Sequence, residues 1–119
     1  MIHFEVCKAE GRIRGFCLTG HAGYAEEGSD IVCSAVSVLA INTVNALEQL
    51  TDEPFDGEED PDGGYLQVTF PGVPGHDAGL LLDALELGMR SLAENYPQYI
   101  AYHSIEEDTQ DTETRSGGV

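Results

Sequence analysis

The stretch IHFEVCKAEGRIRGFCLT, residues 2–19, decides the fold class of this chain. In its first half, apolar Ile2, Phe4 and Val6 alternate with other residues, which is the two-residue period of a strand with one buried face. After an Ala-Glu-Gly turn, residues 13–19 have the composition of a second strand. Two strands joined by so short a turn pair antiparallel, so the sequence predicts an N-terminal β-hairpin.

Further along the chain, apolar residues recur at helical spacing in two long segments. Turn residues, above all the Asp-Pro-Asp-Gly-Gly run at 60–64, separate the remaining strand-like segments. The predicted order is ββαββαβ, with helices at 31–50 and 76–95 and later strands at 55–59, 65–70 and 99–105. We therefore expect an α+β, two-layer domain whose mixed, mostly antiparallel sheet has two helices packed on it.

A chain of 119 residues accommodates one domain, which we place at residues 1–105. The segment 106–119 is acidic and has no apolar periodicity, so a disordered acidic tail is expected. The three cysteines form no CxxC pair, the N-terminus does not resemble a signal peptide, and no segment approaches the about 18 apolar residues of a membrane helix. These features predict a cytoplasmic protein with reduced thiols and no membrane partner.

The formal net charge of −17 limits the classes of partner. Such a field repels nucleic acid and anionic membranes and attracts cationic proteins or peptides. An alternative is that the acidity only provides solubility or reflects adaptation to salt, because charge alone identifies no partner.

A nucleophile and a base are suggested by GHAGYAEEGSDIVCSAVS, residues 20–37. If Asp30 is the N-cap of the first helix, Cys33 is its third residue, beside free backbone N–H groups that favour a thiolate and could hold an oxyanion. His21, at the end of the preceding strand, could fold back as the base, with Asp30 capping the helix or orienting the imidazole. Ser37 is four residues after Cys33 and so shares its helix face.

The loop between the two reactive residues is rich in glycine and could open and close over the site. Its predicted mobile residues are Gly20, Gly23, Tyr24 and Gly28. The alternative interpretation makes the thiol a small core residue and the imidazole a surface group. No metal or cofactor is expected. The other histidines, His3, His76 and His103, do not have the paired spacing of metal ligands, and the glycines match no nucleotide-binding motif.

The string GHAGYAEEGSDIVCSAVSVL closely resembles the signature of the bacterial ribosomal-processing cysteine protease family, Prp. The GYLQV strand and LLDALELGMRSLAENYPQYI are also similar to that family, so the resemblance covers about residues 1–105. It implies a cytosolic, typically homodimeric cysteine endopeptidase that removes an N-terminal extension from protein twenty-seven of the large ribosomal subunit. By motif position, it implies His21 as base and Cys33 as nucleophile, with Asp30 and Ser37 in support.

A second hypothesis requires no chemistry. An acidic dimer could bind or chaperone a basic ribosomal protein without cleaving it, since the charge alone would attract such a partner. The acidic tail is longer than the family pattern and has no assigned role in either hypothesis.

Overall fold

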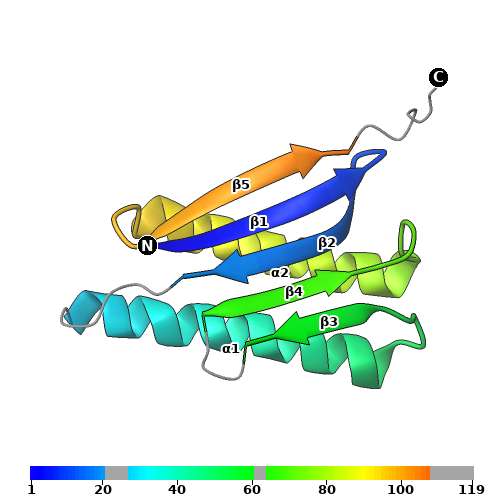
Figure 1. Ribbon diagram of the computed structural model, residues 1–119, viewed down its shortest axis with the longest axis horizontal. Coiled ribbons are helices and arrows are strands. Elements are labelled where there is room, and N and C mark those ends of the chain that lie inside the picture. Colours follow the sequence, from blue (N-terminus) through cyan, green and yellow to red (C-terminus); the bar gives the residue numbers. More distant parts are fainter. Residues whose placement is uncertain (21–26, 61–63, 108–119) are drawn as a thin grey trace.

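The structure, a computed structural model, describes residues 1–20, 27–60 and 64–107. Both helices lie on one face of a five-stranded sheet and run roughly along its strands (Figure 1). The elements are β1 (Ile2–Ala9), β2 (Arg12–Thr19), α1 (Glu27–Leu50), β3 (Asp56–Glu59), β4 (Tyr65–Thr69), α2 (His76–Asn95) and β5 (Ile100–Glu106). The predicted α+β, two-layer ββαββαβ architecture is confirmed.

The strands lie in the order β3-β4-β2-β1-β5. The pairs β1/β2, β2/β4 and β3/β4 are antiparallel, whereas β5 is parallel to β1. In the chain, α2 connects β4 to β5 and runs back along the helix layer. For this reason β5 enters the sheet in the same direction as β1. The sheet is therefore mixed and mostly antiparallel, as the sequence predicts.

The core lies between the sheet and the two helices. Alternate residues of the central strands point into it, and Phe4 and Phe16 pack there with their ring centroids 5.8 Å apart. Each helix contributes one buried stripe, from Val32 to Leu47 on α1 and from Ala78 to Met89 on α2. The apolar residues that recur with a two-residue period in the strands and with a helical period in the helices thus pack together in one core layer.

Helix α1 is more apolar than the sequence analysis allowed. Its residues Ile31–Leu50 have a mean hydropathy of 1.6 and are long and apolar enough to cross a membrane by length and composition. By length and composition this segment comes closer to a membrane helix than the sequence analysis expected, but the core helix of a soluble protein passes the same test. Its stripe from Val32 to Leu47 nevertheless belongs to the core shared with the sheet, as in the core helix of a globular domain.

The folded part of the chain extends beyond the predicted boundary at residue 105. Glu106 ends β5 and its carboxylate accepts a hydrogen bond from the backbone N–H of Gly11 at 3.0 Å. The backbone N–H of Glu107 donates to the carbonyl of Lys8, and its carboxylate pairs with Arg14 at 2.8 Å. These contacts fix two residues that the sequence analysis assigned to the tail, whose remainder, 108–119, lies outside the described residues.

Candidate active site

Cys33 lines a pocket of about 220 Å³ between the N-terminal half of α1 and the sheet. From α1, Ser37 lines the same pocket one turn after Cys33, as the four-residue spacing predicts. From the sheet side come Leu18 near the end of β2, Gly20 just beyond it, and Leu66 of β4. The thiol is half-buried and packs against the edge of the core, so a pocket gives it access to a ligand.

The helix that carries Cys33 begins earlier than predicted. α1 starts at Glu27, so Asp30 lies within its first turn and is not the N-cap, and Cys33 is the seventh residue. The free N–H groups of an α-helix belong to its first turn, about 6 Å along the axis before Cys33. The predicted third-residue position is therefore wrong, and so is its pairing of the thiol with first-turn N–H groups as oxyanion donors.

Two of the predicted loop residues are placed by the structure. Gly28 is the second residue of α1 and so belongs to a helix, not to a loop as expected. Gly20 has φ of +90°, and a Cβ there would lie 2.3 Å from the carbonyl oxygen of Met1. Its N–H donates to the carbonyl of Gly64 at 2.9 Å. Glycine is thus required at this wall of the pocket by backbone conformation and by close approach.

His21, Gly23 and Tyr24 lie outside the described residues, so the structure does not place the predicted base or the middle of the loop. The neighbour of His21 in the chain is Gly20, which lines the same pocket as Cys33. Gly20 and Cys33, the described residues on either side of the predicted motif, therefore line the same pocket.

The sequence analysis missed the residues that line the pocket from β3 and β4. Glu59, Tyr65 and Leu66 come from a hairpin distant in the sequence from Cys33. The only sequence signal for them was the turn at 60–64, which predicts a hairpin but not the part of the sheet that it joins. Their position follows from the pairing of β4 with β2, in which Thr19 lies opposite Tyr65.

The two other thiols differ from Cys33 in their surroundings. Cys7 and Cys17 lie on neighbouring strands, where they alternate with core residues and so belong to the opposite sheet face. Partial burial raises the pKa of both thiols, and the negative charge of Glu5 raises it further. Neither thiol lines the Cys33 pocket. Among the described residues, no group of three or more His, Cys, Asp or Glu side chains is placed to hold a metal ion.

Comparison with known proteins identifies the class to which this chain and its fold belong. The family model described as cysteine protease Prp matches residues 1–101. The ribosomal processing cysteine protease Prp of Staphylococcus aureus is 31% identical over 91 residues, which are 76% of this chain and 86% of the relative.

Solved structures agree with this class. A crystal structure of a Streptococcus mutans protein has 38% sequence identity and a TM-score of 0.82, covering 90% of this chain and 96% of that one. The Staphylococcus aureus Prp crystallised with a covalently linked product peptide has 28% identity and a TM-score of 0.80, covering 87% and 99%. The fold is that of a cysteine protease. This chain belongs to the cysteine protease Prp family.

Proposed function

We propose that this protein is a cysteine endopeptidase that removes the N-terminal extension of a large-subunit ribosomal protein, protein twenty-seven, during ribosome maturation in the cytoplasm. The observation that carries the proposal is the common pocket of Cys33 and Gly20, in a chain of the cysteine protease Prp family. This pocket brings together Cys33, the candidate nucleophile of the predicted motif, and the residue that precedes the predicted base. The charge of −17 supports a basic substrate such as a ribosomal protein.

In this mechanism Cys33 and His21 form a dyad. The imidazole of His21 takes the proton of the Cys33 thiol, and the thiolate attacks the carbonyl carbon of the scissile peptide bond. When the tetrahedral intermediate collapses, the C–N bond breaks and the imidazolium of His21 gives its proton to the leaving amine. Water, deprotonated by the same imidazole, then hydrolyses the thioester and releases the Cys33 thiol.

Two further residues have supporting roles in this proposal. Ser37, which lines the pocket beside Cys33, can hydrogen-bond the thiol or a substrate carbonyl. Asp30, in the first turn of α1, orients the imidazole of His21. The segment that contains Gly20, Gly23 and Tyr24 opens to admit the substrate.

The test is cleavage of a peptide that spans the junction between the extension and the mature ribosomal protein. We expect Cys33→Ala and His21→Ala each to lower kcat/KM by at least about 10³-fold. Cys17→Ala, a matched removal of a thiol outside the pocket, should retain wild-type activity. Product masses from mass spectrometry identify the bond that is cut. Equal cleavage by wild type and Cys33→Ala would end the proposal.

The same experiment separates the protease from the non-catalytic binding module. A binding module would retain the peptide intact and would bind it equally in wild type and Cys33→Ala. Turnover of many peptide molecules per protein molecule, lost in Cys33→Ala, is the outcome expected of the protease.

The protein acts as a homodimer in this proposal, and α1 offers a surface for it. Ile31, Val38 and Ile41 lie along one face of the helix and are 65%, 67% and 51% exposed. No charged residue occurs from 31 to 47, in a chain that is 23% charged. An apolar, uncharged helix face of this kind is typical of an interface between subunits.

Sedimentation measures this association directly. We expect wild type to sediment as a dimer at micromolar concentration and Val38→Lys as a monomer, because the lysine charge would be desolvated in the interface. Ile105→Lys, an equal change at an exposed position of β5, should remain dimeric. A monomeric wild type would contradict the proposal.

A further inference from the structure

A second, larger depression lies next to the Cys33 pocket. This β3 groove, of about 650 Å³, runs between the C-terminal half of α1 and the β3/β4 hairpin. Its floor includes the partly buried apolar side chains Val44, Phe55 and Leu66, which lie over the buried Leu47 and Val68. Its acidic residues are Glu48, Asp52, Glu53, Glu58 and Glu59. No Lys or Arg of the described ranges lines the groove. An apolar floor with an acidic border matches a ligand that carries both apolar and cationic groups.

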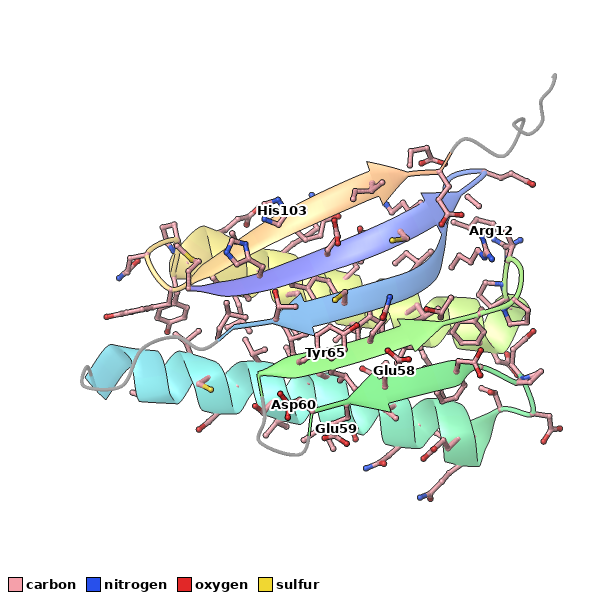
Figure 2. All side chains as sticks on the ribbon, viewed as in Figure 1. Arg12, Glu58, Glu59, Asp60, Tyr65 and His103 are labelled. Atoms are coloured by element: carbon pink, nitrogen blue, oxygen red, sulfur yellow. The ribbon has the colours of Figure 1, made fainter. Side chains whose placement is uncertain are left out.

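One wall of the groove is a strand edge that has no pairing partner among the described residues. β3 (Asp56–Glu59) is the terminal strand of the sheet and pairs only with β4 within the described chain. All four of its residues are exposed. Figure 2 shows Glu58 and Glu59 on this strand, near Tyr65 at the start of β4. A free strand edge presents N–H and C=O groups to which another extended chain can pair.

The groove is continuous with the Cys33 pocket. Glu59 and Leu66 line both depressions, so a ligand can extend from one into the other. From Cys33 to Glu48, α1 rises by about 22 Å, a distance that about seven residues of extended chain cover. A polypeptide whose scissile bond is at Cys33 therefore reaches the acidic residues within about seven residues of that bond.

We propose that the β3 groove binds a basic, extended segment of the substrate polypeptide as an added strand on β3. Its lysine or arginine side chains lie on the acidic border, and its apolar side chains lie on the floor. The link to cleavage rests on the proposed function, but binding in the groove does not. The protein would thus select substrates in which a stretch of alternating basic and apolar residues lies within about seven residues of the cut.

Gly57 provides a steric test of this proposal. It lies opposite Val68 in the β3/β4 pair and lines the groove. A Cβ at this position would meet nothing nearer than 3.9 Å, and the backbone is not left-handed there. Gly57→Leu should therefore fold normally and fill the groove.

The experiment measures binding without cleavage, in a Cys33→Ala background. The probe is a fluorescein-labelled eight-residue peptide of alternating lysine and valine, followed by fluorescence anisotropy. An otherwise equal peptide of glutamate and valine should not bind. We expect Gly57→Leu and Glu58→Lys each to weaken binding of the lysine peptide by at least about fivefold. Glu94→Lys, the same charge change at an exposed site of α2, should have less than about a twofold effect.

Backbone pairing is tested with a peptide that is N-methylated at alternate residues, which cannot donate to the β3 edge. We expect it to bind at least about fivefold more weakly than the unmodified peptide. Equal affinity of the two peptides would overturn the added strand. Equal weakening by Glu94→Lys and Glu58→Lys would overturn the groove, because net charge alone would then explain binding. If Gly57→Leu fails to fold, the comparison of Glu58→Lys with Glu94→Lys still tests whether the peptide binds in the groove.

Failure of the two proposals can be told apart. If no peptide is cleaved but the lysine peptide binds as described, the proposal of groove binding is supported and the proposal of protease activity is overturned. If cleavage depends on Cys33 while Gly57→Leu and Glu58→Lys bind and cleave like wild type, the protease stands and the groove is overturned.

Discussion

At the scale of single residues, the three thiols should differ in their titration. Burial, and then the charge of Glu5, raise the pKa of Cys7 and Cys17. Because only the thiolate reacts, their alkylation by iodoacetamide should reach half its maximal rate at a pH above the ordinary thiol value of about 8.5. Mass spectrometry of a Cys33→Ala variant follows both sites separately as the pH is varied.

The same pKa shifts predict a direction for stability. Between about pH 8.5 and the raised pKa, the unfolded thiols lose their protons while the folded ones keep them, so this part of the stability is lost as the pH rises. Glu5→Gln removes the shared charge and should lower the alkylation midpoints of both thiols. Midpoints at or below the ordinary value, or unchanged by Glu5→Gln, would contradict this electrostatic account.

How far single residues could be predicted depended on their distance in the sequence. Helical spacing was enough to place Ser37 on the same wall as Cys33, because four residues make about one turn. Spacing could not show that Gly20 has a left-handed backbone conformation and lies close to the carbonyl of Met1. It also could not show that Tyr65 lines the pocket. Those positions depend on strand pairing between distant segments.

At the scale of elements, a buried carboxylate joins α2 to the sheet. Glu86 is 9% exposed, its carboxylate lies 3.1 Å from the ammonium nitrogen of Lys8 on β1, and it accepts a hydrogen bond from the hydroxyl of Tyr102 on β5. Burial and this hydrogen bond raise the pKa of Tyr102. Glu86→Ala would leave the ammonium and the hydroxyl without this partner, so we expect the free energy of unfolding to fall by about 1–3 kcal/mol.

Urea denaturation at pH 7 measures this loss. The control is Asp83→Ala, which removes an exposed carboxylate from the same helix and should change the free energy of unfolding by less than about 0.5 kcal/mol. Tyr102→Phe keeps the ring beside Phe4 but removes the hydroxyl, and should cost about 1 kcal/mol. Equal effects of Glu86→Ala and Asp83→Ala would show that the buried contacts do not stabilise the fold.

The elements themselves were predictable from apolar periodicity, but the start of α1 was not. Asp30 is a favourable N-cap residue and Gly28 is typical of a loop, so the sequence favoured a helix that begins after Asp30. The structure nevertheless extends the helix back to Glu27. A helix end is decided by small local differences, whereas the helix interior is decided by the larger burial of residues such as Val36 and Leu47.

At the scale of the whole molecule, the strand order was the part that sequence could not give. The pattern ββαββαβ predicts hairpins, but it does not show that β4 pairs with β2 or that β5 lies beside β1. Both pairings join segments far apart in the chain, so they depend on the common core and not on local turns. The Cys33 pocket and the β3 groove both lie along β4, and so both follow from that strand order.

The net charge of −17 is the molecular property with the clearest consequence for stability. Acidic side chains outnumber basic ones 22 to five, so the compact state suffers self-repulsion that the expanded chain relieves. At 1 M NaCl the Debye length falls to about 3 Å, and this repulsion is screened.

We expect the melting temperature, measured by circular dichroism at pH 7, to be higher in 1 M than in 0.05 M NaCl. A gain of about 1 kcal/mol would raise it by about 4 °C. Sodium sulfate would also strengthen apolar burial, so the matched comparison is potassium chloride, which should act equally. A melting temperature that falls as salt is added would show that ion pairs, such as Arg14 with Glu107, outweigh the repulsion.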